Sequence, residues 1–250
     1  SYDIIDLRVT SSGESRGIFC GMGVCHDCLV DVDGDQNQRA CMTKVKNGMR
    51  IFKQQFYGKY DLKLSNQKEK NNGDMKVETP DILIIGGGVG GMSAASIAAE
   101  SGLDVILIDD RVSLGGQFSK QPTPFHDSTF ISKTDPQIKL GKKLIKRMSS
   151  TGVKVLNGVQ IWAGFAERNV LAIIEERNIL FKPRKLIVAT GAYERPIPIK
   201  GWTLPGVMTT GAVQSLLKTY NVIAGKEIFI AGNGPFNLQV ALELARAGAS

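Results

Sequence analysis

The sequence predicts an α/β protein of two parts, a small cysteine-rich domain and a larger region of strand–turn–helix units. Three observations support this division. All four cysteines lie near the N-terminus, whereas two apolar strand patterns, each followed by a glycine-rich turn and a helix, come later. Between the two parts stands KLSNQKEKNNGDMK (Lys63–Lys76), which is polar and nearly free of apolar residues.

Length and composition favour a globular protein. The 250 residues, 42% of them hydrophobic, suffice for one large or two modest cores. No apolar run approaches the roughly 18 residues of a membrane helix, and the opening SYDIIDLRVT lacks a signal pattern. We therefore expect no transmembrane segment and a reducing, cytoplasmic setting. The net charge of +7 is scattered, and we interpret its concentration in Lys139–Arg147 as a solvated helix face rather than a nucleic-acid patch.

The pattern along the chain gives the expected domain boundaries. We expect a cysteine domain over 1–62, a linker over 63–79, a nucleotide-binding domain over 80–200, and a connection with the start of a second such domain over 201–250. The chain begins at Ser1 without methionine and ends at AGAS, where a helix should lead into a further strand. We therefore expect a C-terminally truncated piece of a longer polypeptide.

The cysteine domain contains FCGMGVCHDC and, further on, RACMT. Its cysteines, Cys20, Cys25, Cys28 and Cys41, follow the spacing C-x4-C-x2-C-x12-C. This is the plant-type ferredoxin spacing of a [2Fe-2S] cluster held by four thiolates. Gly21 and Gly23 should let the backbone bend around the cluster and direct amide N–H groups toward its sulfurs.

Other uses of the four cysteines remain open but fit less well. Disulfides are disfavoured by the expected compartment, and zinc usually takes two separated C-x2-C pairs. A thioredoxin-like pair at Cys25 and Cys28 would leave Cys20 and Cys41 without a role. We interpret His26 as an ordinary loop residue, because four thiolates are already present.

The larger region opens with DILIIGGGVGGMSAASIAAESGLDVILIDD from Asp81, which predicts a strand–glycine turn–helix–strand unit. Its turn meets the pattern G-x-G-x-x-G at Gly86, Gly88 and Gly91. These glycines should permit the tight turn, the approach of a pyrophosphate, and close packing of helix on strand. Asp109, at the end of the second strand, is expected to accept from a ribose hydroxyl. Asp110 is the rival for that role.

A helix and several strands should follow this unit. Residues Pro136 to Ser149 place Ile138, Leu144, Ile145 and Met148 along one helical face. The stretch from Val153 to Ala192 then predicts several short strands separated by turns.

The segment EIFIAGNGPFNLQVALELARAG repeats the strand, glycine turn and helix order. Its turn keeps Gly232 and Gly234 but has Asn237 in place of the third glycine. We expect a second nucleotide-type half, and the pattern leaves open whether it binds NAD(P) or is a structural remnant.

These segments together resemble the glutathione-reductase-like flavoproteins, which have two dinucleotide domains. The turn GGGVGG with its acidic partner is similar to their FAD site, and LIVATGAYERP (Leu186–Pro196) is similar to the segment where the chain returns to the FAD domain. The resemblance implies a small ferredoxin-like [2Fe-2S] domain followed by this fold.

The combination of motifs has a narrower resemblance. GIFCGMGVCHDCLV, RACMT, SLGGQ and ATGAYERPIPIKGWTLPGVMTTGAVQ resemble large or fused subunits of hydrogen cyanide synthase, opine oxidase, heterotetrameric sarcosine oxidase and dye-linked proline or hydroxyproline dehydrogenases. It implies that Gly115, Gly116 and Gln117 lie near a flavin and that Thr190 and Gly191 lie near its pyrophosphate. The alternative is that these are plain loop and turn residues.

The resemblance implies an electron-transferring FAD and [2Fe-2S] subunit of an amine or amino-acid dehydrogenase or oxidase. The C–N bond would be oxidised in a separate amino-acid-oxidase-like flavoprotein subunit, and the complex could lie peripherally on a membrane. No catalytic residue is assigned in this chain, because its motifs serve a cluster or a nucleotide. Two other classes stay open: a self-contained NAD(P)H:acceptor reductase, and a non-catalytic assembly module. A disulfide reductase is disfavoured because residues 42–250 contain no cysteine, and a cysteine pair beyond Ser250 stays open.

Overall fold

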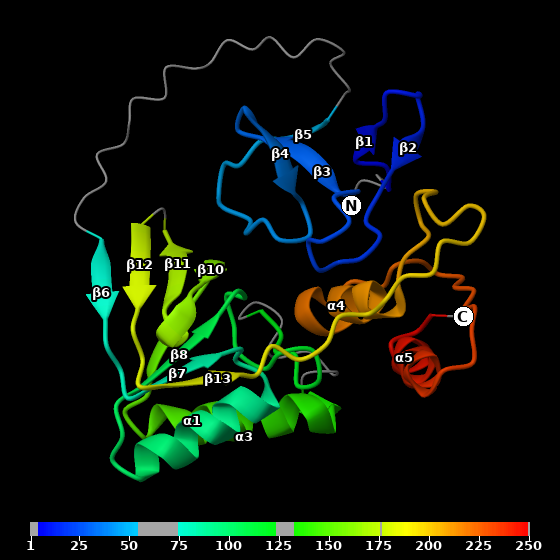
Figure 1. Cartoon of the computed structure of the whole chain (residues 1–250). Helices are drawn as coiled ribbons and strands as arrows, with labels where there is room; N and C mark the ends of the chain where they lie inside the picture. The colour runs from blue at the N-terminus through cyan, green and yellow to red at the C-terminus, as the bar shows by residue number, and fades with distance from the viewer. Residues whose placement is uncertain (1–4, 55–74, 124–132, 176, 250) are drawn as a thin grey trace, which may run out of the picture. The chain divides into compact units, whose positions relative to one another are not determined.

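The computed structural model describes residues 5–54, 75–123, 133–175 and 177–249. The chain divides into two compact units, of which unit 1 combines Ser1–Ser65 with Glu194–Ser250 and unit 2 is Asn66–Tyr193 (Figure 1). The sequence placed a boundary after residue 200 instead, and the domain limits stay a prediction. Of the expected linker, residues 63–74 lie outside the described residues.

Unit 2 is built around a parallel sheet of strand order β13-β7-β8-β9. Two of its strands, β7 and β8, are nearly continuous apolar runs, as expected for strands covered on both faces. Helix α1 connects them. The elements are β7 (Ile82–Ile85), α1 (Val89–Glu100), β8 (Val105–Asp109), β9 (Lys154–Asn157) and β13 (Lys185–Val188). The predicted strand–glycine turn–helix–strand unit is confirmed.

The two faces of this sheet bury separate cores. Helices α1 and α3 (Pro136–Ser149) cover one face, where Ile84, Leu107 and Met92 are fully buried (Figure 1). A second sheet of order β10-β11-β12-β6 packs on the other face through residues such as Phe181 and Ile108. Its strands are β10 (Gln160–Gly164), β11 (Val170–Ile174), β12 (Arg177–Phe181) and β6 (Lys76–Glu78), with the short helix η2 (Ala166–Arg168) between β10 and β11.

Helix α3 has the predicted bounds and the predicted buried face. Ile138 and Met148 are buried, and Leu144 and Ile145 pack against the same core. Its start follows from local chemistry, since the Asp135 side chain accepts from the N–H groups of Gln137 and Ile138 and Pro136 occupies the first turn. Strand β6 lies within the expected linker range, and it is held there by parallel pairing with β12.

The N-terminal part of unit 1 is a small β-structure with long turns. Strand β3 is central in a sheet of order β4-β3-β5, and a short ribbon, β1-β2, stands beside the cysteine loop in sequence. The strands are β1 (Arg8–Val9), β2 (Ser15–Arg16), β3 (Leu29–Val32), β4 (Asp35–Arg39) and β5 (Ile51–Lys53). The loop Cys20–Cys28 leads directly into β3.

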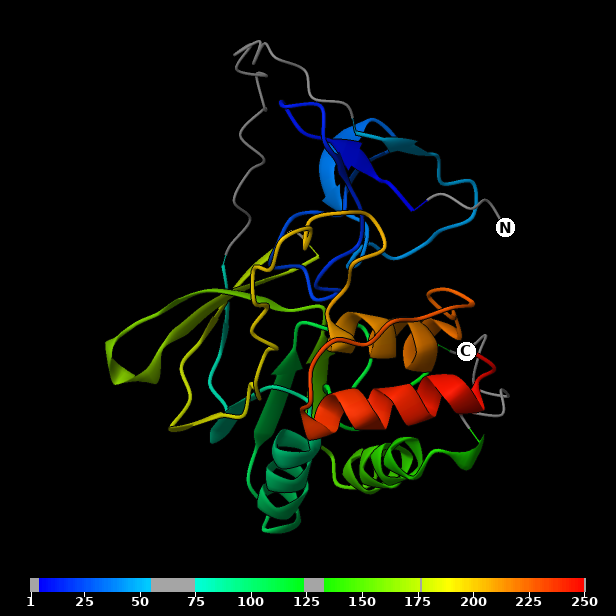
Figure 2. The ribbon, with the colours of Figure 1, turned by 90° about the vertical axis from the view of Figure 1, so that its right-hand side faces the viewer.

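The C-terminal part of unit 1 contributes helices α4 (Thr210–Tyr220) and α5 (Pro235–Arg246), which lie side by side (Figure 2). A buried ion pair joins them, with 3.0 Å between Lys218 Nζ and Glu243 Oε1. The strand expected at EIFIAG is not formed in the described residues. A strand needs a neighbour for its backbone groups, and no described strand pairs with this segment. No helix in the described residues is long and apolar enough to cross a bilayer.

Candidate cluster and nucleotide sites

The structure brings the four predicted cysteines together in unit 1. Cys20 and Cys28 are buried, Cys25 and Cys41 are half-buried, and all four are free thiols. Cys25 and Cys41 hydrogen-bond to Cys20, and Cys41 also bonds to Cys28. The set therefore joins both sequence segments, the loop with three cysteines and the turn that carries the fourth.

These hydrogen bonds change the acidity of the thiols. Those from Cys25 and Cys41 lower the pKa of Cys20, and the one from Cys41 lowers the pKa of Cys28 to about 7. The same bonds raise the pKa of Cys25 and of Cys41, which act as donors. Metal ligation requires thiolates, so binding of a metal would displace the protons in these hydrogen bonds.

The donor set fits a [2Fe-2S] cluster, which takes four cysteine thiolates. In the described part of the chain, no three metal-ligating side chains converge on a position for a single metal ion. A two-iron cluster instead accommodates sulfurs spread around a larger core. His26 lies in the loop between Cys25 and Cys28.

The backbone of the cysteine loop bends as the sequence predicted. Gly21 and Gly23 have φ values of +63° and +79°, in the left-handed region that favours glycine. A Cβ on Gly21 would lie 2.9 Å from the Cα of Ala212 in α4. The Met22 N–H points to Cys20 Sγ at 3.4 Å. His26 also has a positive φ, which the sequence pattern did not indicate.

Three arginines contact the Cys20–Cys28 loop through ion pairs and a hydrogen bond. The sequence analysis did not identify them. Asp27 is buried and pairs with Arg8, with 3.2 Å between Asp27 Oδ1 and an Arg8 Nη, and with Arg16 at 3.8 Å. Arg39 donates to the Gly23 carbonyl at 2.9 Å. An acid between two cysteines in CHDC was the available signal, but its partners are distant in sequence.

The loop also packs on the C-terminal part of unit 1. The Phe19 and Trp202 rings meet edge to face with 5.0 Å between centroids, and the Thr209 N–H donates to the Phe19 carbonyl at 3.0 Å. Trp202 packs against a small core that includes Cys20 and Met22. The cysteine loop is therefore held against the segment that leads into α4.

The first glycine turn in unit 2 has the geometry of a nucleotide-binding turn. Gly86 has a φ of +106°, and a Cβ on Gly91 would collide with the Gly86 carbonyl, so helix and turn are in close contact. Gly88 is the N-cap of α1 and makes no side-chain cap. The N–H groups of this first turn therefore lack a side-chain acceptor and can receive a phosphate.

Asp109 lies beside this turn at the end of β8. Its carboxylate accepts from the Gly87 N–H and from the Arg111 N–H, the latter at 2.7 Å. Burial raises the pKa of Asp109, and the two backbone hydrogen bonds oppose that rise. Asp110 is exposed. The structure thus places Asp109, rather than Asp110, against the glycine turn.

Most of the other residues predicted to lie near the flavin are beside the first glycine turn. Gly115 bridges Gly88, with its N–H donating to the Gly87 carbonyl at 2.9 Å, and a Cβ on Gly116 would lie 2.9 Å from Gly88 Cα. A Cβ on Gly86 would lie 3.1 Å from the Thr190 N atom, and Gly191 follows with a φ of +70°. Gln117 is exposed.

Tyr193 is a further residue near this edge that sequence reasoning missed. Burial and the neighbouring Asp110 carboxylate raise the pKa of its phenol, while Arg111 lowers it. The residue falls in the ATGAY segment, which was the available signal.

The second glycine turn lies in unit 1, not with the first. Gly232 has a φ of +116°, close to that of Gly86, and Gly234 caps α5 without a side-chain bond. Asn237 replaces the third glycine, and its amide donates to the Ala231 carbonyl at 3.1 Å and accepts from Thr210 Oγ1 at 2.6 Å. The turn is therefore tied to α4 by its own side chain.

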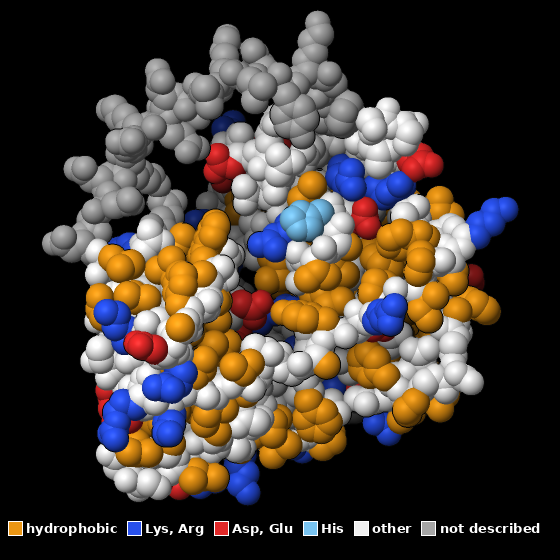
Figure 3. Space-filling view, in the orientation of Figure 1, with side chains coloured by type: hydrophobic (Ala, Val, Ile, Leu, Met, Phe, Trp, Pro, Cys, Tyr) orange, Lys and Arg blue, Asp and Glu red, His pale blue; other side chains and the backbone are white. Residues whose placement is uncertain are grey.

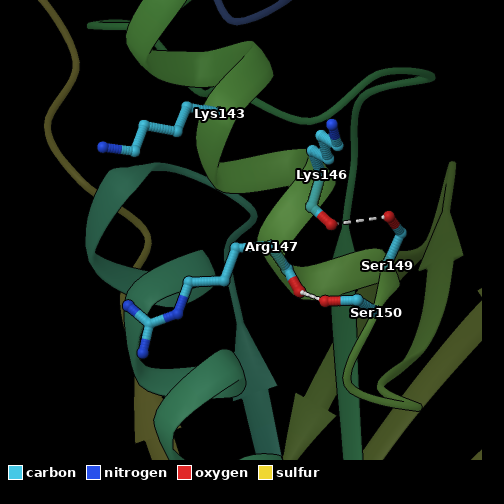
Figure 4. Close-up of a pocket in the computed structure, with 5 residues that line it drawn as sticks. All are labelled: Lys143, Lys146, Arg147, Ser149 and Ser150. Atoms are coloured by element: carbon cyan, nitrogen blue, oxygen red, sulfur yellow. Dashed lines mark hydrogen bonds between the residues drawn. The ribbon is translucent and has the colours of Figure 1, made fainter.

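A basic hollow at the C-terminal end of α3 is a weaker candidate. Figure 4 shows the Ser149 and Ser150 hydroxyls directed at backbone carbonyls of Lys146 and Arg147. The Arg147 guanidinium pairs with Glu100 at 2.7 Å. Lys and Arg side chains occupy several separate places on the face in Figure 3, among acidic and apolar ones. This arrangement agrees with a solvated helix face.

Comparison with known families identifies both parts of the chain. Residues 3–55 match the model of a 2Fe-2S iron-sulfur cluster binding domain. Residues 80–250 match the model described as pyridine nucleotide-disulphide oxidoreductase, which covers more than half of the chain. The chain belongs to this oxidoreductase family. It combines a [2Fe-2S] domain with an FAD-binding flavoprotein fold, as the sequence predicted.

Individual relatives agree with this family. An opine oxidase subunit from Rhizobium meliloti (strain 1021) is 32% identical over 168 residues, 67% of this chain and 36% of its own length. The HcnB subunit of hydrogen cyanide synthase from Pseudomonas protegens is 33% identical over 66% of this chain and 36% of its own. The chain therefore spans about a third of the length of these relatives.

A solved structure supports the fold over nearly the whole chain. L-proline dehydrogenase from P. horikoshii superimposes with a TM-score of 0.77 over 98% of this chain and 46% of its own, at 22% identity. At this identity the likeness concerns the fold alone.

Proposed function

We propose that this chain is the electron-transferring FAD and [2Fe-2S] part of a complex that oxidises the C–N bond of an amine or amino acid. The observation that carries the proposal is that one chain contains two candidate cofactor sites. One consists of four neighbouring cysteine thiols, and the other is the glycine turn before helix α1, which lies beside Asp109 and has no side-chain cap. Relatives named as subunits of opine oxidase and hydrogen cyanide synthase support it.

In this proposal the residues of the chain bind and orient cofactors. Cys20, Cys25, Cys28 and Cys41 hold the cluster, and burial of Cys20 and Cys28 keeps water from that side. Gly86, Gly88 and Gly91 shape the turn that presents the first N–H groups of α1 to the FAD pyrophosphate, and Asp109 accepts from ribose. Gly115, Gly116 and Thr190 border the same turn. Together the bound groups convert a two-electron flavin reduction into single-electron transfer.

The proposal places amine oxidation in a partner flavoprotein subunit. Among the α-helices that the structure describes, α3 and α4 have side-chain caps, from Asp135 and Thr209, whereas α1 and α5, which follow the glycine turns, have none. The prepared features thus favour cofactor binding, and no assigned residue of this chain acts on an amine. We expect a hetero-oligomer with more flavin than this chain alone binds.

Anaerobic rapid mixing tests this assignment. The polypeptide that contains this sequence is mixed with L-proline or sarcosine, first alone and then co-purified with its partner. We expect the flavin to stay oxidised in the isolated polypeptide and to be reduced in the complex. Reduction in the isolated polypeptide at the rate of turnover would move the substrate site into this chain.

One observation favours a second candidate, a self-contained NAD(P)H:acceptor reductase. The second turn keeps the backbone geometry of the first, with similar φ values at Gly232 and Gly86 and an uncapped following helix. Its distinguishing result is bleaching of the flavin in the isolated polypeptide by NADH or NADPH. If neither nucleotide nor amine, with partner present, reduces the flavin, the chain is an assembly module.

A further inference from the structure

Arg39 is the side chain that joins the two cysteine-bearing segments. It ends strand β4 and is half-buried. One guanidinium nitrogen donates to the Gly23 carbonyl at 2.9 Å, in the middle of the loop between Cys20 and Cys25. This hydrogen bond therefore connects the start of the Cys41 turn with the loop that contains Cys20, Cys25 and Cys28.

The backbone of Arg39 also builds the turn of the fourth cysteine. Its carbonyl accepts from the Met42 N–H at 2.9 Å, the Thr43 N–H at 3.0 Å and the Thr43 hydroxyl at 2.9 Å. The next residue, Ala40, donates from its N–H to the Cys28 carbonyl at 2.9 Å. A shift of Arg39 would thus move Cys41 relative to Cys28 and to the loop.

Space around the contact leaves little freedom. Gly23 has a positive φ, and a Cβ there would lie 3.2 Å from the Arg39 guanidinium and 2.7 Å from Met42 Cγ. The guanidinium lies directly against the loop backbone. Its planar fork and permanent charge distinguish it from a lysine at the same place.

The charge of Arg39 differs in effect from that of the other loop arginines. Arg8 and Arg16 both face the Asp27 carboxylate, which offsets their charge locally. Arg39 donates to a neutral carbonyl. A [2Fe-2S] cluster with four thiolates carries about −2 when oxidised and about −3 after accepting one electron, so a nearby positive charge favours the reduced state.

We propose that Arg39 is a positioning residue for the cluster: it holds the Cys41 turn to the Cys20–Cys28 loop, and its charge raises the cluster's reduction potential. The inference rests on the proposed ligation by the four cysteines. It concerns the transfer of one electron to or from the bound cluster, with no bond made or broken in the protein.

Three variants of the full chain separate the effect of the Arg39 charge from the effect of the shape of its guanidinium group. Arg39→Gln removes the charge, Arg39→Lys keeps it, and Arg50→Gln removes an exposed arginine of the same domain as the matched control. Each protein is reconstituted anaerobically with iron and sulfide. Iron and sulfide are then counted, and the potential is titrated by visible absorbance and by electron paramagnetic resonance of the reduced cluster.

We expect Arg39→Gln to lower the potential and to release iron faster than the wild type. At a fixed solution potential its ratio of reduced to oxidised cluster should fall about tenfold, which is about 59 mV for a one-electron couple. Arg39→Lys should keep the wild-type potential while releasing iron faster, because the compact ammonium of lysine does not reproduce the planar guanidinium that lies against the loop backbone. Arg50→Gln should match the wild type in both measurements.

The outcomes distinguish this inference from the ligand assignment. A wild-type protein that binds no iron and sulfide contradicts the cysteine assignment itself. A loaded wild type whose Arg39→Gln variant has unchanged potential and unchanged iron release contradicts the role of Arg39. If Arg39→Gln fails to load while Arg50→Gln loads, the holding role is supported, and a lowered potential in Arg39→Lys overturns the charge role.

Discussion

At the scale of single residues, the proposed cluster site consists of four cysteine sulfurs that hydrogen-bond to one another. Cys20 and Cys28 have lowered pKa values because Cys41 donates to both and Cys25 also donates to Cys20. Ligation by all four requires loss of the remaining protons, so each sulfur contributes to the affinity for metal.

Replacing Cys25 with Ser should therefore abolish the cluster. The hydroxyl is a poor ligand for iron, and the small domain has few buried apolar side chains to hold it together without the cluster. Iron and sulfide analysis after anaerobic purification measures the loss. His26→Asn is the matched control, because asparagine tolerates the positive φ of this position. Equal loss of iron in both variants would assign the effect to the loop rather than to the thiolate.

Replacing Asp109 with Ala should weaken FAD binding without affecting the cluster. A hydrogen bond to a charged acceptor contributes roughly 1.5–3 kcal/mol, so the affinity should fall about ten- to a hundredfold. Flavin fluorescence during titration of the FAD-free protein measures it. Asp110→Ala is the control, since that side chain is exposed. Normal binding by Asp109→Ala together with weak binding by Asp110→Ala would show that the ribose acid is one residue further on.

The sequence indicated the candidate ligand residues more readily than the residues that support them. Cysteine spacing and the glycine pattern are local, so Cys20 to Cys41 and Gly86 to Gly91 could be named from order alone. The contacts of Arg39 with Gly23 and of Asp27 with Arg8 join positions far apart in the chain. No periodicity or motif marks such pairs, because they form only when turns bring the segments together.

At the scale of elements, the cysteine loop packs against the segment that leads into α4 and against the first turn of that helix. Phe19, Gly21 and Met22 contact Trp202, Thr209 or Ala212 through ring packing, a hydrogen bond and close backbone approach. The sequence had assigned Trp202, Thr209 and Ala212 to the connection that begins at residue 201.

Trp202→Ala should destabilise unit 1 by roughly 2 kcal/mol, since it removes the edge-to-face contact and opens the small core around Cys20. Denaturant unfolding of the cofactor-loaded protein, followed by far-ultraviolet circular dichroism and by bleaching of the cluster, measures the change. Trp162→Ala is the matched control, because Trp162 in β10 is 69% exposed and should cost about 0.5 kcal/mol or less. Equal losses of unfolding free energy in the two variants would contradict a stabilising contact between Trp202 and the cysteine loop.

Elements were predictable where local chemistry defines them. Helix α3 was predicted from its one apolar face, and the structure adds an N-cap aspartate and a proline in the first turn that define its start. The EIFIAG segment has a strand-like pattern but no described partner strand, and Lys76–Glu78 pairs with β12 despite its polar sequence. Strand formation depends on a neighbour, which the local sequence does not reveal.

At the scale of the whole molecule, the domain order in the chain differs from the grouping in space. The cysteine domain groups with Glu194–Ser250, although Asn66–Tyr193 follows it in sequence. The first glycine turn and the cysteines thus belong to different units, and each unit carries its own prepared site. Loss of one cofactor should therefore leave the other bound.

The central claim is that one chain holds both an FAD and a [2Fe-2S] cluster, and cofactor analysis of the anaerobically purified wild-type protein tests it most directly. We predict about two irons, two acid-labile sulfides and one FAD per chain, with a reduced-state resonance signal typical of a [2Fe-2S] centre. A protein with one zinc per chain, no sulfide and no flavin would contradict it.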